Sequence, residues 1–175
     1  RFDRPPEGGK LRQEDFCQLL LLPPTAKYDG TALDCAQVIR DFSAEPMADL
    51  YRLFESFVFA YWVGNGDMHL KNLSLAADRD GRHLLSPAYD QVNTAIYPGL
   101  DANLGLPLAP DDRQVDRAAW LRFAERLDIP RRAADRVLGR PAVMLTRAID
   151  LVEQSYLPAN LRPTYRGVLD ARAAV

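Results

Sequence analysis

The middle of the chain reads GNGDMHLKN over residues 64–72, and SPAYD follows at residues 86–90. Glycine and asparagine open the first stretch, and both residues readily adopt the left-handed or tight conformations of turns. Before this stretch, residues 46–61 carry apolar side chains at three- and four-residue steps. That period predicts a buried helix that begins at Pro46 and ends at Gly64.

Two short apolar runs follow the turn, at residues 72–77 and 83–85, and an Asp/Gly segment separates them. This pattern predicts a β-hairpin. Because a hairpin brings its two outer ends together, we expect Asn72 and Asp90 to converge on one spot that faces Asp67.

The rest of the chain reads as helices and loops. Short helices are predicted over residues 15–22 and 33–43, and longer ones from Asp116 to about Leu127 and from Pro130 onward. Residues 91–112 show no period and predict a long loop. The expected fold class is mainly α: a helical domain, of the α+β type, with a small β-hairpin that carries the catalytic and metal-binding residues.

Composition limits the functional classes. A chain of 175 residues fits one domain or one large lobe, and its formal charge of −2 gives no electrostatic footprint for nucleic acid or anionic membrane. No apolar stretch reaches the ~18 residues of a membrane span, and no signal peptide is recognisable. Cys17 and Cys35 have neither zinc-site nor disulfide-framework spacing. We therefore expect a cytoplasmic protein.

Three polar residues carry the predicted chemistry. Asn72 and Asp90 supply one neutral and one anionic oxygen, which suits Mg²⁺, since this ion prefers few protein ligands besides phosphate and water. Asp67 can orient an alcohol and accept its proton, and phosphoryl transfer needs little beyond such positioning and charge neutralisation. Each of these residues could instead be only a turn former or a cap, but their joint order and spacing match those of protein kinases.

The residue pattern of these motifs resembles that of the HipA family, the bacterial toxin kinases of type II toxin–antitoxin systems. The family pattern G-N-x-D-x-H-x-K-N followed by S-P-x-Y-D stands almost intact here, and the segments RFDR (1–4), QED (13–15) and KY (27–28) also look like the family. The resemblance implies that Asp67 is the catalytic aspartate and that Asn72 and Asp90 bind Mg²⁺. It also implies nucleotide contacts from His69, Tyr89, Phe2 and Gln13, although each of these side chains has a structural reading as well. Lys71 has two readings: a contact that neutralises nucleotide phosphate charge, or a pair with a neighbouring carboxylate.

One expected part of such a kinase is missing from the sequence. No glycine-rich loop followed by a strand lysine occurs, and Gly8-Gly9-Lys10 is too short to serve as a phosphate loop. We therefore expect residues 1–175 to be a C-terminal kinase lobe whose N-terminal lobe lies elsewhere. Alternatively, the N-lobe is a separate chain, or the protein is a decayed relative. As this fragment alone, it is expected to be weakly active or inactive.

The resemblance implies an ATP- and Mg²⁺-dependent serine/threonine protein kinase. Its implied partner is a HipB-like helix-turn-helix antitoxin, through which alone it would meet DNA, and its implied substrate class is a translation factor such as an aminoacyl-tRNA synthetase. Two alternatives stay open: a small-molecule or lipid kinase, and a non-catalytic module that docks an antitoxin or a separate N-lobe.

Overall fold

The computed structural model describes residues 2–4, 8–100, 103–110 and 115–174. Arg1 and two parts of the predicted loop, residues 101–102 and 111–112, lie outside them. The elements follow in the order β1 (Gln13–Asp15), α1 (Phe16–Leu19), a 3₁₀ turn η1 (Pro24–Ala26), α2 (Ala32–Phe42), α3 (Pro46–Val63), a 3₁₀ turn η2 (Leu70–Asn72), β2 (Ser74–Ala77), β3 (His83–Leu85), α4 (Arg117–Arg126), α5 (Arg131–Gln154) and α6 (Arg162–Arg172). The expected fold class, mainly α with a small antiparallel β element, is confirmed.

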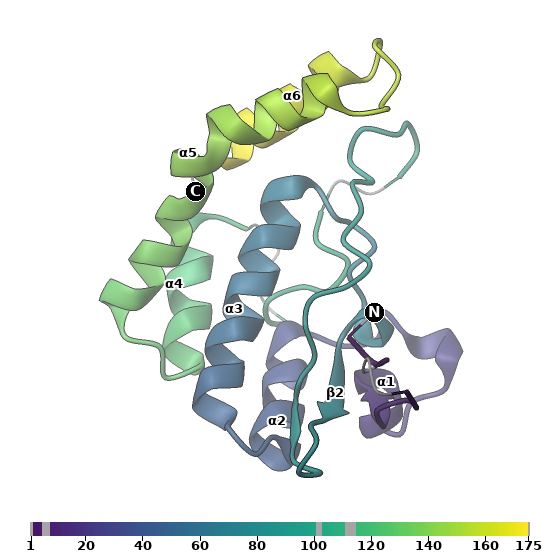
Figure 1. The fold of residues 1–175 in the computed structure, drawn as a ribbon. Coiled ribbons are helices and arrows are strands. Elements are labelled where there is room, and N and C mark those ends of the chain that lie inside the picture. Colours follow the sequence, from purple (N-terminus) through teal and green to yellow (C-terminus); the bar gives the residue numbers. More distant parts are fainter. Residues whose placement is uncertain (1, 5–7, 101–102, 111–114, 175) are drawn as a thin grey trace.

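Helix α3 runs through the middle of the molecule (Figure 1). Helices α4 and α5 cover one of its sides, the strands lie on another, and α6 packs on α5 and the end of α3. The apolar period of α3 accounts for this place, because its buried residues Leu50, Leu53, Phe54, Phe57 and Val58 face the core. Burial of side chains of this size stabilises a fold by about 2 kcal/mol each. Met47, at the start of the predicted apolar face, is 56% exposed and does not belong to the core.

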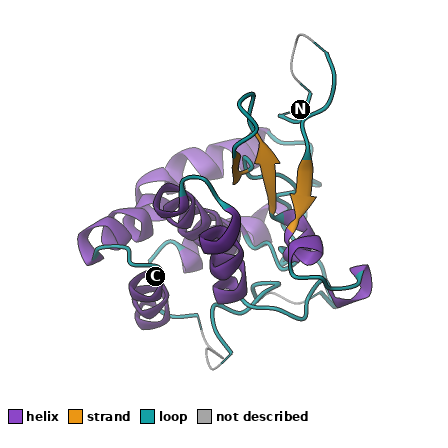
Figure 2. Cartoon of the chain, turned by 90° about the horizontal axis from the view of Figure 1, so that it is seen from below, coloured by secondary structure: helices purple, strands orange, loops and turns teal. Residues whose placement is uncertain are grey.

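The hairpin is part of a three-stranded sheet in the order β1-β2-β3, which lies at one edge of the helical body (Figure 2). Strand β1 pairs antiparallel with β2, and Gln13 lies opposite Ala76. The sequence prediction missed this strand and placed a two-turn helix over residues 15–22. In the structure, Asp15 ends the strand and caps the single turn α1 by accepting a hydrogen bond from the Gln18 N–H. A strand of three residues is too short to show a period.

The loop after β3 is packed rather than detached. Leu106 and Leu108 are fully buried in the main core, and the Pro107 carbonyl accepts a hydrogen bond from the Ala32 N–H at the start of α2. Among the described residues, no helix is both long and apolar enough to cross a bilayer. Cys17 and Cys35 are both buried free thiols.

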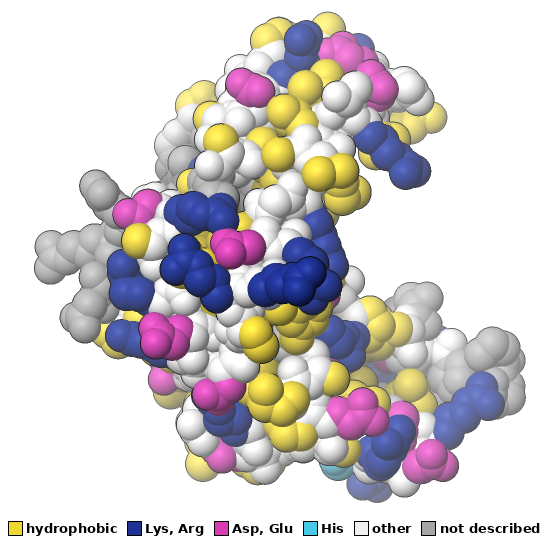
Figure 3. Space-filling model, turned by 90° about the vertical axis from the view of Figure 1, so that its left-hand side faces the viewer, with side chains coloured by type: hydrophobic (Ala, Val, Ile, Leu, Met, Phe, Trp, Pro, Cys, Tyr) yellow, Lys and Arg dark blue, Asp and Glu magenta, His cyan; other side chains and the backbone are white. Residues whose placement is uncertain are grey.

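One wall of the molecule carries an apolar groove between α3 and α5. Figure 3 shows this side, where hydrophobic side chains lie between groups of basic side chains. Two adjoining hollows share Phe59, Trp62 and Met144 as lining residues. Phe59 and Met144 are 42% and 47% exposed, so the groove is open to solvent.

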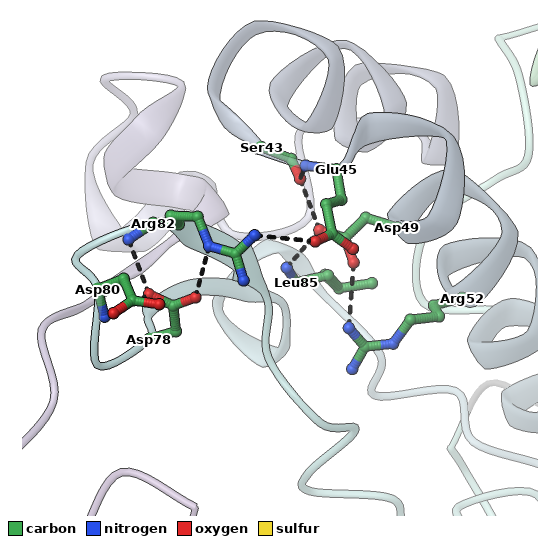
Figure 4. Close-up of polar contacts among 8 residues, drawn as sticks. All are labelled: Ser43, Glu45, Asp49, Arg52, Asp78, Asp80, Arg82 and Leu85. Atoms are coloured by element: carbon green, nitrogen blue, oxygen red, sulfur yellow. Dashed lines mark hydrogen bonds and ion pairs between the residues drawn. The ribbon is translucent and has the colours of Figure 1, made fainter.

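A buried carboxylate joins the start of α3 to the hairpin (Figure 4). The Asp49 side chain is nearly inaccessible and accepts hydrogen bonds from Ser43 Oγ at 2.6 Å, from the Leu85 backbone N–H at 2.7 Å and from Arg52 Nη1 at 3.0 Å. A buried charge is tolerated only when donors compensate its lost hydration, and three donors do so here. Asp49 therefore fixes β3 against α3. The neighbouring exposed pairs of Arg82 with Asp78 and Glu45 contribute less, because solvent screens them.

We expect Asp49→Ala to lower the free energy of unfolding by about 3 kcal/mol, because it leaves the buried Leu85 N–H and the half-buried Ser43 hydroxyl without their acceptor. Urea unfolding followed by circular dichroism measures this loss. The control is Asp150→Ala, which alters an exposed carboxylate on α5 and should change stability by less than about 0.5 kcal/mol. Equal, small effects of both substitutions would contradict the role given to Asp49.

Candidate functional site

The end of α3 places the polar turn. Gly64 caps the helix in the left-handed conformation, with φ of 80°. A Cβ atom here would lie 2.8 Å from Asn93 Nδ2 and 3.0 Å from Ala95 Cβ, so a larger residue would meet both strain and collision. Asn65, which is 1% exposed, then accepts a hydrogen bond from the Asp67 N–H through its side chain at 3.0 Å. As the sequence suggested, Asn65 shapes the turn.

Residues 93–94, which the sequence did not predict as part of the site, bind this turn through hydrogen bonds. Asn93 Nδ2 donates to the Val63 carbonyl at 2.6 Å, and Thr94 Oγ1 accepts the Gly66 N–H at 2.8 Å. The Thr94 N–H also donates to the Gly64 carbonyl at 2.9 Å. The available signal was the three polar residues Gln91, Asn93 and Thr94 soon after Asp90. A side chain that bonds a distant backbone, however, leaves no characteristic spacing in the sequence.

Asn72 joins the turn to the start of the sheet. It lies in the 3₁₀ turn η2 rather than at the start of a strand as predicted, and it is 6% exposed. Its Nδ2 donates to the Asp67 backbone carbonyl at 3.0 Å. No hydrogen bond to Asn72 Oδ1 occurs within the described parts of the chain, so this oxygen keeps its capacity to bind a cation.

The Asp67 side chain is accessible, with 41% of it exposed. Its Oδ1 accepts a hydrogen bond from the Tyr28 hydroxyl and lies 4.0 Å from His69 Nε2. His69 itself is buried, and its Nδ1 has no hydrogen-bond partner among the described residues. Burial, and then the positive charge of Lys27, lower the pKa of His69, so its imidazole is neutral near pH 7.

Asp90 lies at the far end of the hairpin, five residues beyond β3, and is exposed. Its φ of 54° is unusual for a residue other than glycine and costs about 1 kcal/mol, which suggests that the position matters beyond simple connection. The charge of Asp90 reaches His69, whose pKa it raises slightly against the larger lowering effects. The segment before Asp90 lies beside Asn72: residues 86–88 and Gln91 line one small cavity with it.

Tyr89 anchors this segment to the sheet. Its hydroxyl donates to the Lys71 carbonyl at 2.9 Å and lies 2.9 Å from Ser74 Oγ, which also accepts from Gln13 Nε2 at 2.7 Å. The Phe2 ring lies 5.8 Å from the Tyr89 ring, centre to centre. Phe2, Gln13 and Tyr89 therefore form a second group, on the side of the site where β1 and β2 meet.

Lys71 is paired with a carboxylate at the end of β1. Its Nζ forms an ion pair with Asp15 Oδ2 at 2.6 Å, and this hydrogen bond raises the pKa of the lysine. Of the two readings given to Lys71, a nucleotide contact and a pair with a neighbouring carboxylate, this contact matches the second.

The long loop after β3 also packs against the polar turn, through Gly105. A Cβ atom on Gly105 would lie 2.5 Å from the Met68 carbonyl oxygen and 2.9 Å from the Gly66 carbonyl oxygen. Backbone atoms cannot move aside as a flexible side chain can, so only glycine fits here. The loop thereby packs directly against the backbone of the turn.

The arrangement suits a hard cation bound by few protein oxygens. Among the described residues, no group of three or more His, Cys, Asp or Glu side chains could hold a metal ion, so a zinc-type cage has no candidates there. What the structure brings together is an accessible carboxylate, Asp67, with Asn72 bound to its backbone and the Asp90 segment alongside. The mainly helical fold with its small antiparallel sheet is of the kinase-like class that the sequence predicted.

Comparison with known proteins agrees with this class. Residues 1–149 match the family described as the HipA-like C-terminal domain, and the chain belongs to that family. It is 30% identical over 158 residues to a protein of Sinorhizobium fredii named "Putative kinase Y4mE". The aligned region covers 85% of this chain and 37% of the relative. A Haemophilus influenzae protein named "Putative kinase" is 32% identical over 119 residues, which is 62% of this chain and 34% of that protein. The chain thus spans about a third of the length of these relatives.

The fold is similar to that of a solved HipA structure. HipA in the complex of Shewanella oneidensis MR-1 HipA and HipB with operator DNA superimposes with a TM-score of 0.75 at 22% sequence identity. The match covers 99% of this chain and 46% of the HipA chain. At this identity the likeness is one of fold.

Gly105→Ala should lower the free energy of unfolding by about 1–3 kcal/mol, because the added methyl group collides with the backbone at Met68 and Gly66. The matched control is Gly139→Ala within α5, where a Cβ meets nothing within 4 Å and the helix propensity of alanine should add up to about 1 kcal/mol. Chemical denaturation of both variants measures the two changes in the free energy of unfolding, which should have opposite signs. A Gly105→Ala protein as stable as the parent would show that the loop does not press on the turn.

Proposed function

We propose that this chain is the catalytic lobe of a Mg²⁺- and ATP-dependent serine/threonine protein kinase of the HipA type. The observation that carries the proposal is the hydrogen bond from Asn72 Nδ2 to the Asp67 carbonyl, which holds a cation-binding amide beside an accessible carboxylate. Membership of the HipA-like family and the names of its relatives support the same class.

The residues fit a bound Mg²⁺ nucleotide. Asn72 Oδ1 and the exposed Asp90 carboxylate are oxygen ligands of the kind Mg²⁺ takes, and their small number leaves room for phosphate oxygens and water. On the adjoining side, Phe2 and Tyr89 offer two aromatic rings, and Gln13 an amide, for a nucleoside. The bound nucleotide would supply the γ-phosphoryl group and the metal would neutralise its charge.

Asp67 performs the protein's part of the reaction in this proposal. Its accessible carboxylate would accept the hydrogen bond of a serine or threonine hydroxyl, orient that oxygen toward the γ-phosphorus, and take the proton as the new P–O bond forms and the bond to the leaving ADP breaks. Gly64, Asn65 and Thr94 keep the turn rigid, so little reorganisation is needed when the substrate binds. Neutral His69 adds no positive charge that would pair permanently with Asp67.

The proposal assigns the other half of the ATP site to an N-terminal lobe that is not part of residues 1–175. The ATP-binding lysine and the phosphate loop are expected in an N-terminal lobe, consistent with a chain that spans about a third of its relatives. In that case residues 1–175 alone bind ATP weakly. The lobe reading itself stays a prediction.

A HipB-like helix-turn-helix antitoxin is the proposed partner, because the similar HipA structure is a complex with HipB and operator DNA. The proposed substrate is a protein, and an aminoacyl-tRNA synthetase is one candidate through the family resemblance. Co-expression with a HipB-like protein, followed by co-purification, tests the partner; separate elution of the two proteins would contradict it.

The predicted result for the full-length gene product is Mg²⁺-dependent transfer of phosphate from ATP to protein. Asp67→Asn should reduce the turnover number by at least about 1,000-fold and leave ATP affinity nearly unchanged, because it removes only the proton acceptor. Radiolabelled ATP, with phosphoamino acid analysis of the product, measures the transfer.

The matched control is Asp80→Asn, an exposed carboxylate in the hairpin turn, which should leave the activity at the parent level. Transfer to lipid or small-molecule alcohols instead of protein would favour the alternative kinase class. A parent that binds antitoxin but neither binds nor turns over Mg²⁺-ATP would favour the non-catalytic binding module.

A further inference from the structure

Tyr28 contacts the proposed catalytic carboxylate, although it lies 39 residues earlier in the chain. Its hydroxyl donates a hydrogen bond to Asp67 Oδ1. The phenol is 43% exposed, so it is not a core residue held by packing alone. Its place at the carboxylate needs another explanation.

The backbone next to Tyr28 is attached to the polar turn. The Leu70 N–H donates to the Lys27 carbonyl at 3.0 Å, and the Asp29 N–H donates to the Ala26 carbonyl at 3.0 Å. These bonds fix the chain on both sides of Tyr28. Segment 26–30 therefore keeps its position relative to η2, and with it relative to Asn72.

The Tyr28 ring is held on two sides. Its centre lies 5.1 Å from that of His69, edge to face at 79°, and Lys27 Nζ lies 4.8 Å from the ring centre. Edge-to-face and cation–π contacts of this kind each contribute to a defined ring orientation. The hydrogen bond to Asp67, with burial as a smaller effect, raises the pKa of Tyr28 to about 12, so the phenol remains a donor at neutral pH.

Only one carboxylate oxygen of Asp67 is used by these contacts. Tyr28 occupies Oδ1, and within the described parts of the chain no hydrogen bond reaches Oδ2. A half-exposed aspartate without a partner would rotate among several side-chain conformers. A donor on Oδ1 selects one conformer and presents Oδ2.

We propose that Tyr28 is a positioning residue of the kinase reaction: its hydroxyl holds Asp67 by Oδ1 so that Oδ2 faces the substrate alcohol. This inference rests on the proposed function. In the opposite role, the phenol would occupy the place of the substrate hydroxyl and block it. The two roles predict opposite effects when the hydroxyl is removed.

The test is Tyr28→Phe in the full-length gene product, which deletes the hydroxyl and keeps the ring against His69. We expect kcat for phosphate transfer to fall about 10- to 100-fold, since a loosely held group misplaced by about 1 Å costs this much, while KM for ATP stays unchanged. Tyr156→Phe is the control, because Tyr156 is fully exposed, and it should match the parent. A Tyr28→Phe kcat equal to or above that of the parent overturns the proposal.

A second measurement does not depend on activity. Tyr28→Phe and Asp67→Ala, made singly and together, form a double-mutant cycle in urea unfolding. Non-additive shifts of the unfolding midpoint are expected if the hydroxyl and the carboxylate interact, and additive shifts overturn the contact. An inactive parent protein overturns the proposed function and this role together, whereas an active parent with an unaffected Tyr28→Phe form overturns this role alone.

Discussion

The left-handed end of helix α3 at Gly64 is the constraint on which the rest of the site depends. Only a residue without a side chain can turn here while Asn93, Ala95 and Val168 lie against it. The turn brings three separate parts of the chain together: α3, the segment after Asp90, and α6, to which Val168 belongs. From this point the direction of residues 65–67, and therefore the position of Asp67, follows.

The two ends of α3 divide the task of holding the site. At its start, Asp49 takes the Leu85 N–H and fixes the last strand of the hairpin, which leads to Asp90. At its end, Gly64 fixes the turn that bears Asp67. A buried, well-packed helix is rigid. Asp67 and Asp90, which are held from opposite ends of α3, therefore keep a fixed position relative to each other. The buried charge of Asp49 is compatible with a stable fold only because three donors satisfy it.

The sequence predicted the parts that depend on local chemistry. The α3 period, its glycine cap, the hairpin and the Asp116 cap of α4 were all visible, because each is a pattern within a few residues. Strand β1 was missed, since it gains its structure from pairing with β2 and not from its own three residues.

Contacts between distant segments could not be predicted in the same way. Lys71 pairs with Asp15, Tyr28 reaches Asp67, and Gly105 fits against Met68. None of these pairs has a spacing that a single sequence reveals. The order of Asp67, Asn72 and Asp90 pointed to a shared site, and the structure links Asn72 to Asp67 directly, while the roles of all three as reacting groups stay predictions.

The most direct test of the account is a crystal structure of the full-length gene product with Mg²⁺ and a non-hydrolysable ATP analogue. The account predicts a metal ion bound by Asn72 Oδ1 and the Asp90 carboxylate, the γ-phosphate facing Asp67, and the nucleoside on the side of Phe2, Gln13 and Tyr89. A nucleotide bound elsewhere, or a metal ion that contacts neither Asn72 nor Asp90, would contradict it.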